Sequence, residues 1–312
     1  MISMSIDRES VCVLIPTLNE APTIGALIQD FRRSGFSRIL VIDGQSTDST
    51  REIAAQSGAR VVVQKSRGKG NALIEAFSEI EQPYVLMVDG DGTYSVLDAD
   101  RMLQPLLEGY DQVIGNRLIE ENRKAFSRLN FFGNNILNRL FKLAHSVFLF
   151  DILSGYRAFT LEAIKKMHLK EAGFGIETEI SAEAVRSGQK IRVIPIRYGR
   201  RPVSSPTKLN PFHDGFKIMT TIYRLARMNN PLFYFGLIGV IITIAGIFTG
   251  IFVILEWLKQ IEHLPLAILT VLLIVLGFQI FMFGILSDMM LSLHRDMVQE
   301  IQDLERRRER YQ

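Results

Sequence analysis

Short apolar runs alternate with segments of helical character along the first third of the chain. The runs lie at residues 11–15, 39–43, 60–64 and 85–88. The apolar runs at residues 11–15, 39–43 and 85–88 are typical of strands that are buried on both faces of a parallel sheet, and residues 60–64 fit a further strand. Helical segments separate them, at residues 21–33, around Ala54 and Ala55, and at residues 72–80. Strands that alternate with helices predict βαβ units, so we expect an α/β domain with a mostly parallel sheet.

The next hundred residues continue this alternation less regularly. Residues 98–107 and 175–187 have helical character, and residues 190–198 resemble a strand. Residues 113–117 fit a strand or a turn, and residues 151–157 fit a turn. We therefore expect the α/β domain to extend over residues 1–211.

Two carboxylates follow directly on the run at residues 85–88. Asp89 and Asp91 stand at alternate positions in the sequence DGD. In an open α/β sheet, ligands bind at the carboxyl ends of the strands. Paired carboxylates at that edge are hard oxygen ligands, which suit Mg²⁺ or Mn²⁺ bridged to a diphosphate. The sequence therefore predicts a metal and phosphate site at this edge.

Two long stretches without charges lie near the C-terminus, at residues 232–255 and 264–286. Each is longer than the roughly 20 residues that a helix needs to cross a bilayer. Hydrophobic residues make up 47 % of the chain and the mean hydropathy is +0.16, which is high for a soluble enzyme. We expect a transmembrane hairpin within residues 231–290, and a pair of buried core helices is the alternative.

The charges around these stretches predict their orientation. The first ten residues are polar and lead into a strand, so no signal peptide is expected. Lys and Arg cluster before the first stretch, whereas the loop at residues 256–263 has only Lys259. The second stretch is followed by Arg306, Arg307, Arg308 and Arg310. The positive-inside rule then predicts a multi-pass protein of the cell membrane with its α/β domain and both termini in the cytoplasm.

Three further segments have a composition that suits a membrane surface. Residues 124–150 form an amphipathic element with an aromatic face, which fits either a membrane interface or ordinary core packing. Residues 186–228 hold ten Lys or Arg against one acidic residue, which fits lipid headgroups, phosphate oxygens or a solvated face. Within them, residues 212–230 fit an interfacial amphipathic helix. The cytoplasmic helical tail at residues 291–312 fits either a coiled coil, in a homo-oligomer, or a solvated tail.

Two common nucleotide motifs are absent from the sequence. No G-x-G-x-x-G follows the first apolar run, and the GKGN at residues 68–71 does not fit G-x-x-x-x-G-K-[ST]. Any nucleotide is therefore bound in another way, and no nucleic-acid partner is expected. Cys12 is the sole cysteine and lies in an apolar run, so we expect an inert core residue.

Four motifs in this order resemble the family 2 glycosyltransferases of the GT-A type, which have a Rossmann-like fold. They are PTLNE from Pro16, VIDGQSTD from Val41, GKGNA from Gly68 and DGD from Asp89. GNR at Gly115, LSGYR at Leu153 and TKL at Thr207 narrow the resemblance to the dolichyl- and polyprenyl-phosphate sugar transferases. That group includes dolichol-phosphate mannose synthase and the archaeal enzymes that start S-layer N-glycans.

The resemblance implies a role for each matching residue. The nucleotide-sugar donor would contact Pro16, Leu18, Glu20, Ile42, Asp43, Gly44, Lys69, Asp89, Gly90, Asp91, Arg117, Arg201 and Lys208. The metal, Mg²⁺ or Mn²⁺, would be held by Asp89, Asp91 and Thr93. The lipid phosphate would be bound by Arg117, Arg128 and Arg201. The catalytic residues would be Asp91, Arg117 and Arg128.

The chain departs from the family pattern at two places. Thr93 stands where relatives often have Gln as a further metal ligand. The segment RPVSSPTK at residues 201–208 lacks a glycine and is one residue longer than the family's Arg-x-x-Gly-x-Ser-Lys, so either Arg200 or Arg201 matches its arginine. The Gln-x-x-Arg-Trp motif of processive relatives is also absent, which implies a single transfer.

The reaction implied is the inverting transfer of a sugar from a UDP- or GDP-sugar to dolichyl or polyprenyl phosphate, in protein N-glycosylation or a related pathway. A lipid phosphate is already anionic, so this reaction needs no strong base. The alternative is transfer to a lipid or glycolipid hydroxyl, with Glu177 or Glu179 as base; otherwise both glutamates would be solvated on a helix surface, which we prefer. A non-enzymatic membrane adaptor is a third hypothesis, disfavoured by the intact Asp89 and Asp91.

Overall fold

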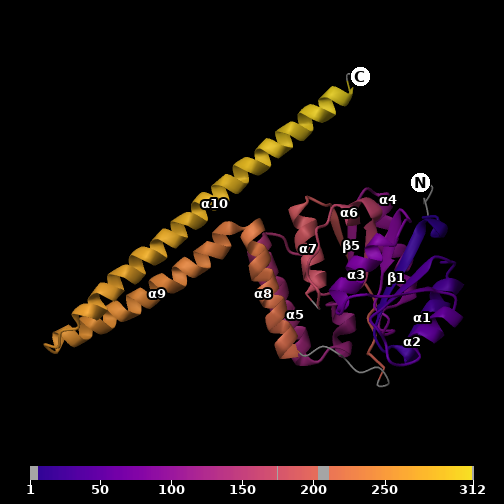
Figure 1. Cartoon of the computed structure of the whole chain (residues 1–312), viewed down its shortest axis with the longest axis horizontal. Helices are drawn as coiled ribbons and strands as arrows, with labels where there is room; N and C mark the ends of the chain where they lie inside the picture. Colours follow the sequence, from indigo (N-terminus) through magenta and orange to yellow (C-terminus); the bar gives the residue numbers. More distant parts are fainter. Residues whose placement is uncertain (1–5, 174, 203–210, 311–312) are drawn as a thin grey trace. The chain divides into compact units, whose positions relative to one another are not determined.

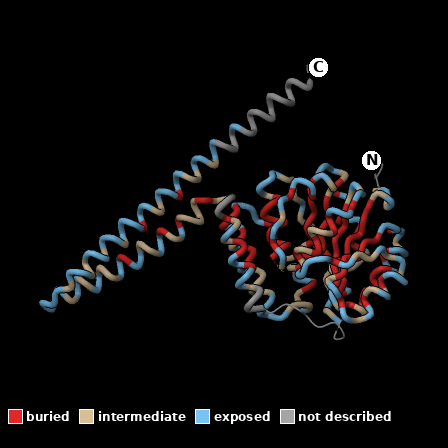
Figure 2. The backbone as a smooth tube through the Cα atoms, viewed as in Figure 1, coloured by how far each residue is buried: buried red, intermediate tan, exposed pale blue. Residues whose placement is uncertain are grey.

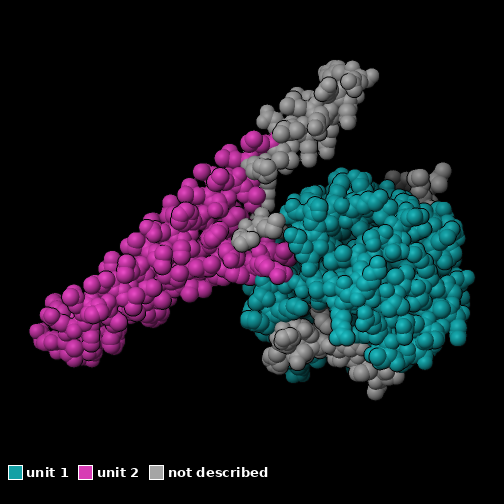
Figure 3. All heavy atoms as spheres, in the orientation of Figure 1, with its two compact units in different colours: residues 1–222 teal, residues 223–312 magenta. Residues whose placement is uncertain are grey.

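The computed structural model describes all residues except 1–5, 174, 203–210 and 311–312. It consists of two compact units, Met1–Ile222 and Tyr223–Gln312 (Figure 3). The predicted division into domains at residue 211 is not tested by this partition and stays a prediction.

The first unit is built on a mixed sheet that is mostly parallel. Its strand order is β3-β2-β1-β4-β6-β5-β7. Only β6 runs antiparallel to its neighbours β4 and β5 among the described strands. The strands are β1 Val11–Thr17, β2 Ile39–Asp43, β3 Arg60–Val63, β4 Tyr84–Met87, β5 Gln112–Asn116, β6 Arg157–Thr160 and β7 Ile191–Pro195. The predicted fold class is confirmed.

Ten α-helices surround or follow the strands in the described part of the chain (Figure 1). In the first unit they are α1 Ala21–Arg33, α2 Thr50–Gln56, α3 Lys69–Ser78, α4 Ala99–Leu107, α5 Arg128–His145, α6 Leu161–Lys165 and α7 Ile176–Arg186. α8 Pro211–Asn229 crosses the boundary between the units, and α9 Pro231–Leu258 and α10 Leu264–Arg310 form the second. Short 3₁₀ helices lie at Arg8–Ser10, Val96–Asp98 and Glu120–Ala125.

Both faces of the central strands are covered by helices, so every residue of β1 and β2 is buried (Figure 2). Val13 of β1 lies in a core shared with α1 and α4, whereas Leu14 lies in a second core shared with α3 and α7. This alternation follows from the two-residue period of a strand. Cys12 belongs to the second core, and burial raises the pKa of its thiol to about 12, so the prediction of a core cysteine is confirmed.

One strand prediction is confirmed and another needs correction. The strand predicted at residues 60–64 is β3, an edge strand in which Val63 is 44 % exposed. The segment predicted as a turn at residues 151–157 leads into β6, which the pattern did not indicate because this strand has only four residues and begins with an arginine. Arg157 is nevertheless fully buried, and its guanidinium donates hydrogen bonds to the carbonyls of Ile152 and Ser154.

The amphipathic segment at residues 124–150 contains α5, and the interpretation as core packing describes one side of that helix. Leu137 and Phe141 are buried in the first unit. Phe132 and Leu143, by contrast, are 65 % and 60 % exposed. Core packing therefore accounts for the inner face only, and the outer face leaves large apolar side chains uncovered within this chain.

The second unit is a helical hairpin. The helical segments Pro231–Leu258 and Leu264–Leu293 are long and apolar enough to cross a membrane. In the most apolar 18 residues of each segment, only 11 % and 6 %, respectively, are buried. This exposure argues against core helices and supports a candidate transmembrane hairpin. The two helices approach closely at glycines, since a Cβ at Gly277 would lie 2.7 Å from the carbonyl oxygen of Gly239. Small residues allow such close approach between apolar helices.

Candidate functional site

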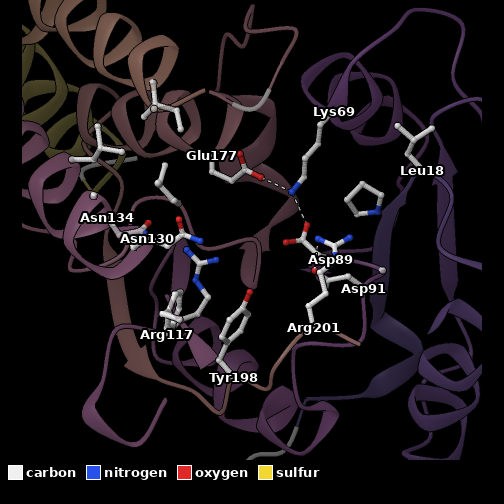
Figure 4. A pocket seen from close by; sticks show the side chains of 18 of the residues that line it. Leu18, Lys69, Asp89, Asp91, Arg117, Asn130, Asn134, Glu177, Tyr198 and Arg201 are labelled. Carbon is white, nitrogen blue, oxygen red and sulfur yellow. Dashed lines mark hydrogen bonds and ion pairs between the residues drawn. The ribbon is translucent and has the colours of Figure 1, made fainter. Parts of the chain in front are cut away.

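One cavity of about 770 Å³ lies in the first unit, over the carboxyl ends of β1, β2 and β4 (Figure 4). Polar and charged side chains line one part of it, and apolar side chains from α5 and α8 line another. Loops at the carboxyl ends of parallel strands form the ligand sites of open α/β sheets, as the sequence predicted.

Asp89 and Asp91 enter this cavity from the loop that follows β4. Their loop is held against β1, because Thr23 donates to the carbonyl of Gly90 at 2.7 Å and a Cβ at Gly90 would lie 2.8 Å from Thr17. Thr93 donates to Asp91 Oδ1 from its hydroxyl at 2.6 Å and from its backbone N–H at 3.1 Å. In this structure Thr93 therefore orients Asp91.

Two basic side chains bind these carboxylates. Lys69 Nζ lies 2.6 Å from Asp89 Oδ1, and also 2.6 Å from Glu177 Oε1. Arg201 joins Asp91, at 3.2 Å, to Glu20, at 2.6 Å. Five segments that are distant in the sequence are thereby connected around one centre.

The charges at this centre shift the pKa values of the two aspartates in opposite directions. Burial raises the pKa of Asp91, and the nearby charge of Asp89 raises it further. Burial also disfavours the charged form of Asp89, but Lys69 outweighs it and holds the pKa of Asp89 below its usual value. In the same way, burial would lower the pKa of Lys69, whereas Asp89 and Glu177 raise it. A cation bound between Asp89 and Asp91 would relieve the repulsion between the two carboxylates that raises the pKa of Asp91.

This donor set fits a divalent cation that also binds a diphosphate. Mg²⁺ sites commonly use one or two carboxylates, with the remaining ligands from phosphates and water. Asp89 and Asp91 supply that pair. Among the described residues no group of three or more His, Cys, Asp or Glu is arranged to hold a metal by protein ligands alone.

Gly155 packs against Asp89 and limits the space around this carboxylate. A Cβ at Gly155 would lie 2.1 Å from Asp89 Oδ2. The backbone N–H of Gly155 donates to the hydroxyl of Tyr94 at 3.0 Å. The LSGYR segment therefore packs directly against the carboxylate, and only glycine fits at this position.

Arg117 is fixed in the cavity wall. Its Nε and Nη2 each donate to the Asp151 carboxylate at 2.8 Å, and its guanidinium lies against the rings of Tyr198 and Phe126. Burial disfavours the charged form of Arg117, but Asp151 raises its pKa well above the ordinary value. Nη1 of Arg117 donates over a long distance of 3.4 Å to the hydroxyl of Tyr94. An arginine held in this way is a rigid donor for an anion in the cavity.

Apart from Lys208, the residues predicted to bind the nucleotide sugar divide into two groups. Those that line the cavity are Pro16, Leu18, Glu20, Gly44, Lys69, Asp89, Gly90, Asp91, Arg117 and Arg201. Ile42 and Asp43 are fully buried beneath it, where Asp43 accepts hydrogen bonds from the backbone N–H and the hydroxyl of Ser46. Asp43 thus shapes the loop at residues 44–47.

Two basic residues considered in the sequence analysis, Arg128 and Arg200, do not line the cavity. Arg128 is exposed at the first position of α5 and is not among the lining residues. Arg200 donates to the carbonyl of Lys124, so Arg201 is the arginine of this pair that reaches the cavity. Lys208 lies outside the described residues.

Sequence reasoning misjudged Glu177 and Glu179, because neither is solvated. Both are 4 % exposed in the first turn of α7. Glu177 lines the cavity, whereas Glu179 accepts hydrogen bonds from the backbone N–H groups of Lys170 and Glu171. Sequence reasoning also did not identify Asp151 and Tyr198 as residues of the site. No sequence pattern marked these residues, because their partners lie in distant segments.

The apolar part of the cavity is formed by two amphipathic helices. α5 contributes Leu129, Gly133, Ile136, Leu137 and Leu140, and α8 contributes Gly215, Phe216, Ile218 and Met219. Asn130 and Asn134 of α5 lie between this wall and Arg117 (Figure 4). The cavity therefore leads from the charged centre to an apolar surface.

Residues 12–165 match the sequence profile described as Glycosyl transferase family 2. The chain is 50 % identical over 299 residues to glycosyltransferase AglJ of Haloferax volcanii, covering 95 % of this chain and 99 % of that protein. It is 32 % identical over 219 residues to the dolichyl-phosphate hexose transferase of the same organism, covering 70 % and 94 %.

Solved structures show the same fold. Glucosyl-3-phosphoglycerate synthase of Mycobacterium tuberculosis, in complex with Mn²⁺, UDP-glucose and phosphoglyceric acid, superposes with a TM-score of 0.57 at 23 % identity. The superposition covers 69 % of this chain and 79 % of that one.

Proposed function

Because the chain belongs to glycosyl transferase family 2 and is a glycosyltransferase of the GT-A fold, we propose that it transfers a sugar from a UDP- or GDP-sugar to dolichyl or another polyprenyl phosphate. The observation that supports this acceptor is the continuity of the cavity, which connects Asp89, Asp91 and Arg117 with the apolar wall of α5 and α8. A polyprenyl phosphate has the same two parts, an anionic head and an apolar chain.

The donor would bind at the end of the cavity formed by β1 and β2. Pro16, Leu18 and Gly44 line that end and suit a base and ribose, while Arg201 reaches the diphosphate position beside Asp91. The Mycobacterium neighbour in complex with UDP-glucose supports a nucleotide-sugar donor.

Asp89 and Asp91 would hold the cation, Mg²⁺ or Mn²⁺. Bound there, it supplies positive charge to the diphosphate as the bond to the sugar breaks. The Mn²⁺ in the Mycobacterium neighbour supports this assignment. Thr93 keeps Asp91 in place, and Arg201 supplies further positive charge.

The acceptor phosphate would bind beside Arg117. An oxygen of the lipid phosphate attacks the anomeric carbon, a bond to that carbon forms, and the nucleoside diphosphate leaves from the opposite side. The nucleophile is already anionic, so Arg117 has only to position it, which contributes through proximity. The name of the second Haloferax relative supports a dolichyl-phosphate acceptor. Arg128 stays a proposed secondary contact.

The candidate transmembrane hairpin supports a location at the membrane, where such an acceptor resides. A polyprenyl chain does not leave the bilayer easily, since each buried CH₂ contributes about 0.8 kcal/mol. The proposed orientation keeps the glycosyltransferase unit and both termini in the cytoplasm, where nucleotide sugars are made.

The proposal is tested with membranes that contain the chain, radiolabelled UDP- and GDP-sugars, and polyprenyl phosphates. The expected product is a lipid that carries the label and releases it in mild acid, as a glycosyl phosphate does. EDTA is expected to abolish its formation and Mn²⁺ or Mg²⁺ to restore it. Label found only in neutral lipids would refute the phosphate acceptor.

A second candidate reaction is transfer to a lipid hydroxyl. It is favoured by Glu177, whose carboxylate lines the cavity and provides a base that a hydroxyl nucleophile would require. The same membrane experiment decides between the two, because the hydroxyl product is stable to mild acid.

The apolar part of the cavity, formed by α5 and α8, can be tested by a substitution at Gly133. A Cβ at Gly133 would meet nothing within 4 Å, so Gly133→Phe places its ring in open space of the cavity. Each CH₂ of the acceptor that loses its contact costs about 0.8 kcal/mol. We expect the KM for a long polyprenyl phosphate to rise about tenfold, with the KM for the donor unchanged. Gly133→Ala is the matched control, and equal KM values for the two variants would contradict a lipid chain at this wall.

A further inference from the structure

Gln279 of α10 is a polar side chain in the middle of an apolar helical segment. It lies at the midpoint of Leu264–Leu293, the second candidate membrane span, which has 30 residues. A helix of that many residues is about 45 Å long, and the hydrocarbon core of a bilayer is about 30 Å thick. In a bilayer, Gln279 would therefore lie among the lipid chains, far from both headgroup layers.

The hairpin leaves the amide group of Gln279 without a partner. The side chain is exposed, and among the described residues none makes a hydrogen bond with its amide. The threonines of the hairpin differ in this respect. The hydroxyls of Thr243 and Thr249 each donate to a carbonyl of α9 at 2.8 Å, and the hydroxyl of Thr270 donates to a carbonyl of α10 at 2.9 Å. An amide in hydrocarbon without a hydrogen bond is strongly unfavourable, so Gln279 requires a partner from outside this chain.

Gln279 lies on the face of α10 that points away from α9. The close approach between the two helices uses Gly277 and Gly284, and Gln279 is two positions from Gly277, which is about 200° around the helix. Exposed apolar residues recur on the Gln279 face at alternating spacings of three and four, namely Leu272, Val275, Met282, Leu286, Met289 and Leu293. This is the a/d repeat of a helix that pairs with another helix, and Gln279 occupies a central a position in it.

We propose that Gln279 pairs with Gln279 of a second copy of this chain, so that two hairpins associate in the membrane through their α10 helices. An amide group has both donors and an acceptor, so two identical amides satisfy each other across a twofold axis. Two copies inserted in the same orientation present α10 in parallel, which brings the same position of each helix to that axis. A polar residue at a single a position fixes the register of such a pair. The inference depends on the candidate transmembrane hairpin and is independent of the proposed donor and acceptor.

The association is measured with the full-length chain, fused at its N-terminus to one fluorescent protein and reconstituted in phosphatidylcholine vesicles. The fraction of spots that bleach in two steps gives the dissociation constant as the ratio of protein to lipid is lowered. Gln279→Leu removes the amide at similar side-chain size and is expected to raise this constant about tenfold, as for the loss of hydrogen bonds between membrane helices. Gln279→Asn keeps an amide and is expected to retain most of the association.

Thr270→Val is the matched control for removing a polar group from α10. Thr270 donates to the carbonyl of Leu266 and to the hydroxyl of Thr249, so its bonds lie within the hairpin. Its replacement is expected to change the dissociation constant less than about twofold. A wild-type chain that stays monomeric at every ratio of protein to lipid would overturn the proposal. Equal dissociation constants for the wild type and Gln279→Leu would overturn it as well.

Disulfide crosslinking locates the contact on α10. The native Cys12 is buried, so one cysteine introduced into α10 supplies the reactive thiol. Leu286→Cys lies seven positions from Gln279, on the same face, and is expected to form a covalent dimer in the vesicles when copper phenanthroline is added as oxidant. Phe278→Cys is the control, because Phe278 is 61 % exposed but lies about 100° around the helix from Gln279. Crosslinking through Phe278→Cys in place of Leu286→Cys would show that the copies meet at another face.

Discussion

Replacing Asp91 by Asn is expected to lower the rate of sugar transfer about 10³-fold. Asp91 is one of two carboxylates that would hold the cation, and it also binds Arg201. A metal at a leaving phosphate contributes several kcal/mol, and each 1.4 kcal/mol corresponds to tenfold in rate. The measurement is the initial rate of glycolipid formation in membranes with saturating donor, compared at several Mn²⁺ concentrations.

Asp98→Asn is the control for the Asp91 variant. Asp98 is also a buried aspartate, but it binds Arg101 and the backbone N–H of Arg197 outside the cavity. Its replacement is expected to lower stability and leave the rate within a few-fold of the wild type. Full activity of Asp91→Asn, with an unchanged requirement for Mn²⁺, would show that the cation is held elsewhere.

Replacing Gly155 by Ala is expected to reduce activity on the order of 10²-fold, as for a catalytic group displaced by about 1 Å. The added methyl group would lie 2.1 Å from Asp89 Oδ2 and 2.6 Å from Cγ, so the whole carboxylate must move. The measurement is kcat/KM for the donor together with the concentration of Mn²⁺ that gives half-maximal rate, which is expected to rise.

Gly133→Ala serves here as a control for the added methyl group, since its Cβ meets nothing within 4 Å. Thermal unfolding of both variants separates a displaced carboxylate from a general loss of stability. A fully active Gly155→Ala variant would mean that Asp89 does not occupy the position seen beside this glycine.

Several parts of the fold and site could be predicted because they depend on local patterns. The apolar runs of β1, β2 and β4 predict buried strands, since both faces of each strand are covered. Asp89 and Asp91 follow β4 directly, so a parallel sheet brings them to its carboxyl edge whatever the details of packing. The charge-free stretches of α9 and α10 exceed the thickness of a bilayer by length alone.

Other features depend on partners that no local pattern identifies. β6 is short and begins with Arg157, and it becomes a strand because β4 and β5 pair with it on both sides. The sequence predicted Arg117 as a phosphate ligand and indicated no partner for it. In the structure, two nitrogen atoms of Arg117 donate hydrogen bonds to Asp151, which fixes the orientation of the guanidinium group. The sequence pattern of α5 is compatible with core packing and with a membrane interface. The tertiary structure shows that one face of this helix is buried and that the other is exposed.

The sequence by itself determined the α/β fold, the carboxylate pair at the sheet edge and the candidate membrane hairpin. Each follows from periodicity, residue type or length within one continuous segment. Only the tertiary structure decided that Lys69 lies between Asp89 and Glu177, and that Arg201 connects Glu20 with Asp91. Those pairings join loops and helices that are far apart along the chain. Their geometry is fixed by how the helices pack on the sheet, which no single segment encodes.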